Sequence, residues 1–273
     1  MMITFKDYVA EKEKYYADMI KEKNLFKNRK FVIVQVGSVE ASNRYVKNKL
    51  KDCEKIGLPA ELKHFSEDIS QAEFLLELEK LNNDKSVSSY IVQLPLPKHI
   101  DEAVVKKAII PSKDADGFSP EHIADAATPK GIVNWLIDNN HNLSSKLAIV
   151  IGRSNIVGKP LVDLLRKQDM TVINMHSKTT EEQKQELIPL ADLIVVATGH
   201  RHTLTNQYKY KPTTIIIDCG INFDENGKIC GDCDRDLPVA KQSQVPGSVG
   251  LTTRLQLMVN AITLEQLYIK RTS

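Results

Sequence analysis

The chain has 273 residues, with 37 lysines and arginines against 35 aspartates and glutamates, a formal net charge of +2. Hydrophobic residues make up 42% and charged residues 26%, which excludes disordered, collagen-like and disulfide-stapled chains. The length favours two domains, and the balanced charge excludes a global attraction to nucleic acid or to an anionic membrane.

The first half of the chain predicts alternating helices and strands. The patterns predict helices over 5–23, 42–56 and 71–81, and strands over 30–36, 61–65 and 89–93. Residues 110–118 are expected to form a loop, and Pro129 to begin a helix that reaches Ile137. We therefore place a domain boundary near residue 118.

The second half alternates strand and helix more regularly, which is typical of a parallel sheet covered by helices. Strands are predicted over 147–151, 170–175, 193–197 and 214–218, and helices over 161–167, 180–188 and 253–269. The predicted fold class is α/β, with two α/β domains and an active-site cleft between them. Residues 1–118, joined by the helix at 253–273, form the first domain, and residues 119–252 form a second, Rossmann-like domain.

No segment predicts a membrane anchor or a secretion signal. The longest apolar runs, at 147–151 and 193–197, fall short of the roughly 20 residues that cross a bilayer. The first residues are charged from Lys6 onward and lack an apolar signal segment. We therefore expect a cytoplasmic protein with no membrane or nucleic-acid partner.

A glycine loop follows the strand at 147–151 and reads GRSNIVGKP over 152–160. Glycines after a parallel strand let the backbone turn tightly and approach a pyrophosphate at the start of the next helix. The loop lacks the three-glycine dinucleotide fingerprint, so a simple strand-to-helix turn remains an alternative.

The region at the end of the next strand, 174–179, lacks the acid that usually binds the ribose of NAD. Arg153, His176 and Lys178 offer donors and positive charge instead, which suits a 2′-phosphate and favours NADP. The alternative is that Arg153 and Lys178 are solvated surface charges.

The predicted helix at 42–56 places Ser42, Tyr45 and Lys49 on one face. Burial would lower the pKa of Lys49 and make it a base or proton shuttle near neutral pH. The same lysine in a lysine-rich helix is also compatible with a plain surface position. The Tyr-x-x-x-Lys spacing occurs in short-chain dehydrogenases, but there it follows the glycine loop, whereas here it precedes it.

Two further polar groups stand out. Gln93 is the single amide of an apolar stretch and precedes two prolines, a position suited to a cleft. The segment at 113–117 begins like a calcium loop but lacks the later ligands. Asp116 is therefore expected to accept hydrogen bonds from a heterocycle, with an Asp turn that caps the next segment as the alternative.

Cys230 and Cys233 have CxxC spacing, with Cys219 nearby. A structural zinc needs a fourth ligand, and none is evident in the sequence around them. We expect reduced thiols and no metal.

Together these segments resemble the bifunctional methylenetetrahydrofolate dehydrogenase/methenyltetrahydrofolate cyclohydrolase family. The matching segments are VGSVEASNRYVKNK at 36–49, VQLPLP at 92–97, KDADG at 113–117, GRSNIVGKP at 152–160, HSKT at 176–179, DCGIN at 218–222 and VPGSVG at 245–250. The resemblance implies NADP-linked oxidation of 5,10-methylenetetrahydrofolate, hydrolysis of the methenyl product to 10-formyltetrahydrofolate, a role in one-carbon metabolism and purine biosynthesis, and a homodimer.

The resemblance also implies roles for individual residues. Lys49, Tyr45, Gln93 and Asp116 are the implied catalytic group, in which Lys49 manages protons, Gln93 bonds to it, Tyr45 packs on the folate and Asp116 holds the pterin. The implied substrate contacts are Ser42, Tyr45, Val92, Gln93, Leu94, Asp116, Pro246, Gly247 and Gly250. The implied cofactor contacts are Gly152, Arg153, Ser154, His176, Ser177 and Ile221.

The chain departs from the family pattern at Ala126 and Ala127, where Pro-Cys is common, and at Ser248 and Leu251, where glycine and proline are common. A Cβ at Ser248 would be costly if that position needed a positive φ. Two alternatives therefore stay open: a folate- and NADP-binding paralogue that has lost one activity, and a two-domain dehydrogenase of another small substrate.

Overall fold

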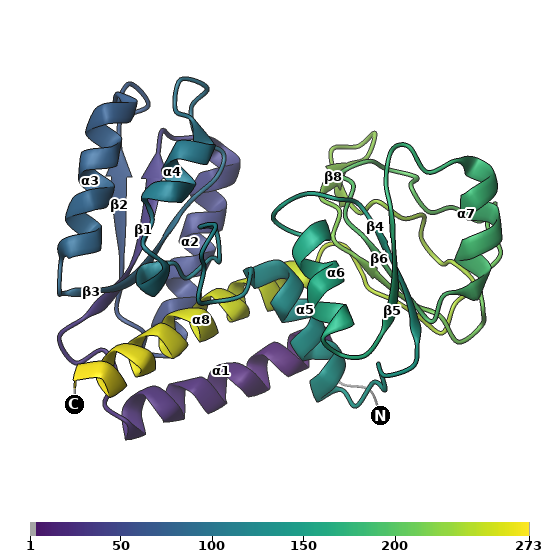
Figure 1. Ribbon diagram of the computed structural model, residues 1–273, viewed down its shortest axis with the longest axis horizontal. Coiled ribbons are helices and arrows are strands. Elements are labelled where there is room, and N and C mark those ends of the chain that lie inside the picture. Colours follow the sequence, from purple (N-terminus) through teal and green to yellow (C-terminus); the bar gives the residue numbers. More distant parts are fainter. Residues whose placement is uncertain (1–3, 273) are drawn as a thin grey trace. The chain divides into compact units, whose positions relative to one another are not determined.

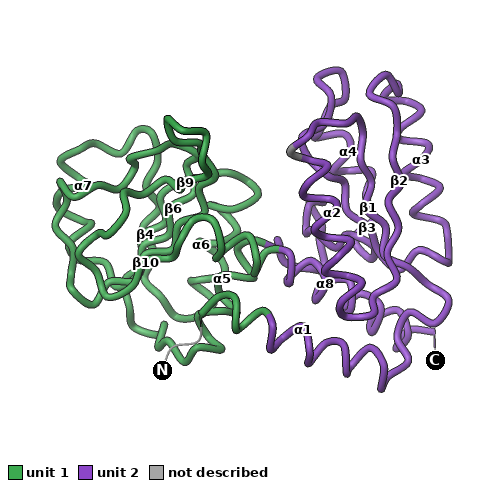
Figure 2. The backbone as a smooth tube through the Cα atoms, turned by 180° about the vertical axis from the view of Figure 1, so that it is seen from behind, with its two compact units in different colours: residues 1–9, 128–253 green, residues 10–127, 254–273 purple. Residues whose placement is uncertain are grey.

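The computed structural model describes residues 4–272 and divides the chain into two compact units (Figure 2). One unit joins Ala10–Ala127 to the segment from Arg254 onward, and the other joins the residues up to Val9 to Thr128–Thr253. Each unit contains a parallel sheet with helices, which confirms the predicted α/β class. Among the described residues, no helix is long and apolar enough to span a membrane.

The unit that contains residues 10–127 has three parallel strands in the order β2-β1-β3 (Figure 1). Its elements are most of α1 (Phe5–Glu22), β1 (Lys30–Val36), α2 (Glu40–Lys55), β2 (Ala60–Phe65), α3 (Gln71–Asn83), β3 (Val87–Val92), α4 (Glu102–Ala108), the 3-10 turn η1 (Pro111–Lys113) and most of α8 (Val249–Thr272).

The central position of β1 explains its composition. A strand between two parallel neighbours is covered on both faces, and six of the seven residues of β1 are buried. Val34 pairs with Val92 of β3 and with Lys63 of the more exposed edge strand β2. Phe74 and Leu78 of α3, both 0% exposed, pack in the core formed with β1 and β3. This core holds the carboxyl end of β3 in place.

The other unit has five parallel strands in the order β10-β7-β6-β4-β5. Its elements are α5 (Ala127–Asp138), β4 (Leu147–Ile151), α6 (Gly158–Arg166), β5 (Thr171–Met175), α7 (Glu181–Leu187), the 3-10 turn η2 (Ile188–Leu190), β6 (Leu193–Val196), β7 (Ile215–Asp218), β8 (Asn222–Phe223), β9 (Ile229–Cys230) and β10 (Lys241–Gln242). The strand order reverses between β4 and β6, because β5 lies on one side of β4 and β6 on the other. Ligands of doubly wound sheets bind at this switch point, outside the carboxyl ends of the strands.

The division between the units differs from the predicted boundary near residue 118. Asn260 of α8 donates from its Nδ2 to the carbonyls of Ala115 at 2.8 Å and Asp125 at 3.0 Å, which keeps residues up to 127 in one unit. At the other end, the ring of Phe5 stacks on Trp135 at 4.0 Å between centroids, which explains why the residues up to Val9 belong to the second unit. The boundary therefore follows these contacts rather than the predicted loop at 110–118.

Candidate functional site

A lysine and an amide meet at the carboxyl end of β3. Lys49 Nζ, from α2, donates to Gln93 Oε1 at 2.8 Å. The Gln93 amide is oriented for this contact, because its Nε2 donates to the carbonyl of Leu94 at 2.7 Å. The backbone N–H of Gln93 in turn donates to the carbonyl of Val34, so β1 fixes its position. The structure thus brings together two of the predicted catalytic residues.

Asp116 completes this cluster, because Lys49 and Asp116 each change the proton affinity of the other. Burial lowers the pKa of Lys49 below its ordinary value, while the charge of Asp116 acts in the opposite direction. Burial raises the pKa of Asp116, and the charge of Lys49 partly offsets that rise. In both groups burial is the larger effect, so the pKa of Lys49 lies below its ordinary value and that of Asp116 above it.

The loop that carries Asp116 is held by its neighbour Asp114. Asp114 accepts from the N–H of Asp116 at 3.2 Å and from that of Ser119 at 2.6 Å. Gly117 follows with a φ of +65°, and a Cβ there would lie 2.6 Å from the carbonyl oxygen of Ala124. Asp114 therefore forms the Asp turn of this segment, and Asp116 interacts electrostatically with Lys49. That Asp116 binds a heterocycle stays a prediction. Sequence reasoning missed Asp114 as a positioning residue.

The other predicted substrate residues of this unit differ in exposure. Tyr45 lies one turn before Lys49 on α2 and is 38% exposed, so its ring is available to a ligand. Ser42 is buried, and its Oγ lies 3.5 Å from the carbonyl of Leu94, at the outer limit of a hydrogen bond. Val92 is 2% exposed and packs in the core, so it can offer a ligand only its backbone.

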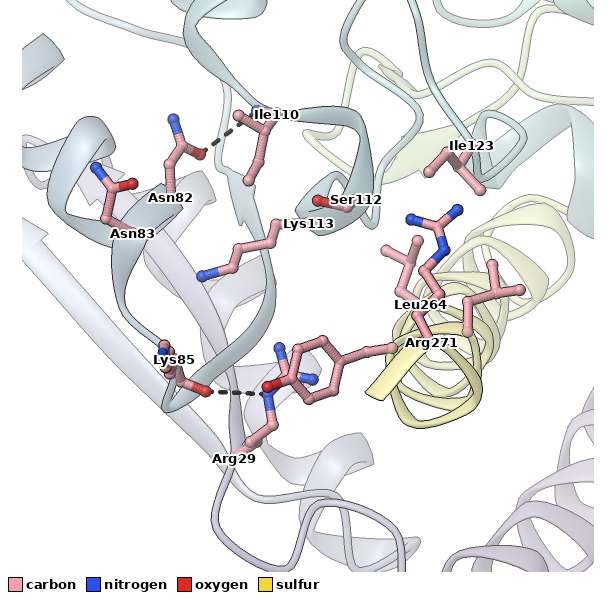
Figure 3. Close-up of a pocket in the computed structure, with 12 residues that line it drawn as sticks. Arg29, Asn82, Asn83, Lys85, Ile110, Ser112, Lys113, Ile123, Leu264 and Arg271 are labelled. Carbon is pink, nitrogen blue, oxygen red and sulfur yellow. Dashed lines mark hydrogen bonds between the residues drawn. The ribbon is translucent and has the colours of Figure 1, made fainter. Parts of the chain in front are cut away.

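A cavity of about 250 Å³ lies elsewhere in the same unit, between α3, η1 and α8 (Figure 3). Two of its four cationic side chains, those of Lys113 and Arg29, bind other parts of the protein. Lys113 Nζ donates to the carbonyls of Leu81 and Asp84, at 2.7 and 2.6 Å. Arg29 pairs with Glu265 at 2.7 Å and lies 3.5 Å from the ring centroid of Tyr268. The cavity is not lined by Lys49, Gln93 or Asp116. We place the candidate site at these three residues, because they combine a buried amine, an amide and a carboxyl group.

In the second unit, the glycine loop lies at the switch point of the sheet. Gly152 follows β4 with a φ of +127°, and a Cβ there would lie 2.2 Å from the carbonyl oxygen of Ala197. A Cβ at Gly158, the first residue of α6, would lie 2.3 Å from the carbonyl oxygen of Gly152. Both positions therefore require glycine, because a Cβ would clash with the backbone of the chain itself. This packing is compatible with the predicted phosphate loop and with the alternative of a simple strand-to-helix turn.

Polar side chains hold this loop in shape. Ser154 Oγ accepts from the N–H groups of Val157 and Gly158, at 3.2 and 3.3 Å, before the first turn of α6. Asn174 of β5 donates from its Nδ2 to the carbonyl of Gly152 at 2.7 Å and to that of Val150 at 2.9 Å. Sequence reasoning did not single out Asn174, because an amide inside a strand carries no local signal of this role.

The predicted phosphate contacts Arg153 and Ser177 are exposed, as is Lys178. His176 is half-buried, and its Nδ1 accepts from the backbone N–H of Lys178 at 3.2 Å, so this ring also shapes the turn after β5. No residue between Met175 and Thr180 is acidic. Anionic ligands would therefore meet donors and positive charge here, and no carboxylate.

Two buried aspartates organise the loops at the same edge of the sheet. Asp232, 0% exposed, accepts through Oδ2 from the N–H of Thr198 at 2.7 Å and of Gly199 at 3.0 Å, beyond the end of β6. Asp218 accepts from the N–H of Gly220 at 2.8 Å and of Asp232 at 3.0 Å. These bonds shape the segment before Ile221, the predicted cofactor contact, which is 53% exposed.

The CxxC segment packs against these aspartates. Asp232 lies between its two cysteines, and a Cβ at Gly231 would lie 2.0 Å from Asp218 Oδ2. All four cysteines are free, and burial raises the pKa of Cys219 and Cys233 well above the ordinary range. High pKa values disfavour the thiolate that redox or metal chemistry uses.

The predicted folate-side residues Pro246, Gly247 and Gly250 also belong to the second unit. Pro246 and Gly247 precede α8, and Gly250 is its second residue. The structure corrects the concern about Ser248, because the positive φ of +114° belongs to Gly247 and not to Ser248. Ser248 is 3% exposed, and its Oγ donates to the carbonyl of Gln244 at 2.5 Å. Its Cβ therefore causes no backbone strain at this position.

Comparisons with known proteins match both halves of the chain. The tetrahydrofolate dehydrogenase/cyclohydrolase catalytic domain matches residues 5–116, and the NAD(P)-binding domain of the same family matches residues 126–268. The bifunctional protein FolD of Bacillus anthracis is 41% identical over 242 residues, 84% of this chain and 84% of the relative.

Solved structures of the same family match nearly the whole chain. The bifunctional enzyme FolD, a methylenetetrahydrofolate dehydrogenase/cyclohydrolase from Campylobacter jejuni, is similar with a TM-score of 0.89 at 33% identity, covering 96% of each chain. The methylenetetrahydrofolate dehydrogenase-cyclohydrolase of Trypanosoma brucei, complexed with NADP and an inhibitor, has a TM-score of 0.89 at 25% identity and covers 98% of each chain. The chain therefore belongs to the tetrahydrofolate dehydrogenase/cyclohydrolase family.

Proposed function

We infer that this chain oxidises 5,10-methylenetetrahydrofolate with NADP and hydrolyses the resulting methenyl form to 10-formyltetrahydrofolate. The bond between Lys49 Nζ and Gln93 Oε1, beside the Asp116 carboxyl, is the observation that carries this proposal. Family membership supports both activities, because the matched regions cover the catalytic and the NAD(P)-binding domains.

Hydration of a methenyl cation requires a group that takes up a proton. Water adds to the bridging carbon, and the neutral amine of Lys49 accepts the proton that the water loses. The bond from that carbon to the ring nitrogen then breaks, the nitrogen gains a proton and the formyl group remains on the other nitrogen, so one proton is released overall. Because burial lowers the pKa of Lys49, its amine is available for this step nearer to neutral pH than an exposed lysine.

The neighbours of Lys49 position its amine and the substrate. Gln93 holds the Lys49 amine through a carbonyl oxygen that its own bond to Leu94 orients. Asp116, protonated or not, offers a carboxyl group to the amino and ring N–H groups of a pterin. The exposed ring of Tyr45 provides a flat surface on which a pterin can stack.

The glycine loop of the second unit fits NADP. Gly152 and Gly158 allow a pyrophosphate to approach the backbone, and the exposed donors Arg153 and Ser177 suit a 2′-phosphate. When bound, NADP supplies the acceptor for the hydride of the methylene bridge. The chain itself contributes the alignment of donor and acceptor, so this step demands few catalytic side chains.

The resemblance also motivates a homodimer in the cytoplasm, which we propose without a structural observation for it. Light scattering coupled to size-exclusion chromatography measures the mass directly. A mass near 30.7 kDa, that of one chain, would rule the dimer out.

The assay mixes the protein with 5,10-methylenetetrahydrofolate and either NADP or NAD, and follows the absorbance of the methenyl product. A separate assay follows the loss of added 5,10-methenyltetrahydrofolate without cofactor. We expect turnover in both, with NADP preferred. Binding of folate and NADP without turnover would favour the paralogue that has lost its activities, and binding of NADP alone would favour a dehydrogenase of another substrate.

A further inference from the structure

An ion pair joins α8 to α2 one helical turn beyond Lys49. Arg254 Nε donates to Asp52 Oδ2 at 2.5 Å, and the side chains of Arg254 and Asp52 are 22% and 7% exposed. Lys55 Nζ donates to the other oxygen, Asp52 Oδ1, at 3.2 Å. Both carboxylate oxygens of Asp52 therefore bind cations, which holds the Arg254 side chain in one place.

This pair lies on the face of α2 that carries the candidate catalytic lysine. Asp52 is three residues beyond Lys49, and residues three apart are neighbours on a helix surface. Arg254 approaches that face from α8, a helix far away in the sequence. Guanidinium groups do not lose their proton in proteins, so Arg254 presents a constant positive charge at every pH that the enzyme meets.

The surroundings of Lys49 make this charge significant. Burial is the largest influence and lowers the pKa of Lys49, Asp116 and Cys53 raise it, and Arg254 lowers it. Gln93 and Tyr45 are the neutral polar neighbours, at the end of β3 and on α2. Arg254 is thus the cation that counteracts the attraction of Asp116 for a protonated lysine.

We propose that Arg254, held by Asp52, is a positioning residue that keeps a positive charge beside Lys49 and so favours the neutral amine. The proposal rests on the proton-accepting role of Lys49 in the proposed function. A cation near an ammonium group disfavours the protonated form, whereas Asp116 alone would favour it. The ion pair between Arg254 and Asp52 therefore lowers the proton affinity of Lys49, which the neighbouring Asp116 would otherwise raise.

The test replaces Arg254 by methionine, which removes the charge, or by lysine, which keeps it. The protonation of the Lys49 side chain is followed by NMR in the substrate-free protein, with Lys49→Met identifying its signal. We expect Lys49 to titrate at higher pH in Arg254→Met and close to the wild-type pH in Arg254→Lys. Hydration of the methenyl substrate by Arg254→Met should fall about three- to tenfold at the acidic end of the pH profile and recover at high pH.

A matched control is available on the same helix. Arg29 and Glu265 form another buried pair, at 2.7 Å with side chains 10% and 4% exposed, and Glu265 lies about 16 Å along α8 from Arg254. Glu265→Gln should lower stability but leave the titration of Lys49 unchanged.

An unmoved Lys49 titration in Arg254→Met would overturn the proposal, even if activity fell. A rise in the KM for folate with that titration unmoved would make Arg254 a substrate contact. An equal shift in Glu265→Gln would mean general loosening of the unit and would also overturn it. Because the titration needs no substrate, its result stands apart from the turnover assay that tests the proposed function.

Discussion

Removal of the buried Asp232 carboxylate should destabilise the second unit, because it anchors the loop after β6. Its Oδ2 accepts from Thr198 N at 2.7 Å, Thr198 Oγ1 at 2.9 Å and Gly199 N at 3.0 Å, and its Oδ1 accepts from Asn222 Nδ2 at 2.8 Å. In Asp232→Ala the N–H groups of Thr198 and Gly199 lose their acceptor. The Asn222 amide keeps its bond to the Gly231 carbonyl at 3.1 Å, and the Thr198 hydroxyl keeps its contact with Thr203 Oγ1 at 2.8 Å. At about 1–1.5 kcal/mol for each of these two donors, we expect a loss of about 2–3 kcal/mol in the free energy of unfolding.

Trp135 provides a local assay for this variant. It is the single tryptophan of the chain, 0% exposed, and lies on α5 in the same unit as Asp232. Urea unfolding followed by its fluorescence should show the loss, and NADP titration should show weaker binding because the loops after β6 and β7 are released. Glu225→Ala, which removes an exposed partner of Arg201, should leave both measurements nearly unchanged. A loss below about 1 kcal/mol in Asp232→Ala would refute the reasoning.

Three further predictions concern the second unit. Gly152→Ala should lower the free energy of unfolding by at least about 2 kcal/mol and weaken NADP binding. Gly227 also has a positive φ, +72°, but no atom lies within 4 Å of its Cβ position, so Gly227→Ala should lower that free energy by less. Equal losses in calorimetry would contradict the steric argument. Arg153→Ala should weaken NADP binding about tenfold or more with little effect on NAD, and an unchanged ratio of the two dissociation constants would exclude the phosphate contact. Ser248→Gly should destabilise the protein by about 1 kcal/mol, because it removes the bond to Gln244, and a gain in stability would mean that Ser248 is strained after all.

The elements with strong hydrophobic patterns were predictable from the sequence. The predicted strands at 30–36 and 147–151 coincide with β1 and β4. Both are short apolar runs, which is the pattern of a parallel strand that is covered on both faces. The short elements were missed. Helix α4 has seven residues, and β8, β9 and β10 have two each, so neither periodicity nor composition distinguishes them from loops.

The candidate site was predictable where one local motif carries it. The glycine loop requires its glycines for steric reasons that the sequence already suggests, and Lys49 shares a helix face with Tyr45. Positioning residues were not predictable, because their partners are distant in the sequence. Asp232 binds the loop at Thr198, and Arg254 binds Asp52, and each of these contacts exists only after folding.

Lys49 also illustrates the limit of composition. In the sequence it is one of several lysines on α2, and only the contact with Gln93 and the desolvation of its amine separate it from Lys47 and Lys51. The same holds for Asp114 and Asp116, which the sequence does not distinguish. In the structure Asp114 holds the loop, whereas Asp116 interacts with Lys49. Motif order indicated the family, whereas the chemistry of each side chain depends on burial and partners.

Hydration of 5,10-methenyltetrahydrofolate by Lys49→Met tests the central claim most directly. The substitution removes the amine but keeps a side chain of similar length, and Lys47→Met on the exposed face of α2 is the matched control. We predict that Lys49→Met abolishes hydration while NADP binds with wild-type affinity, and that Lys47→Met hydrates normally. Hydration by Lys49→Met at the wild-type rate would contradict the role assigned to Lys49.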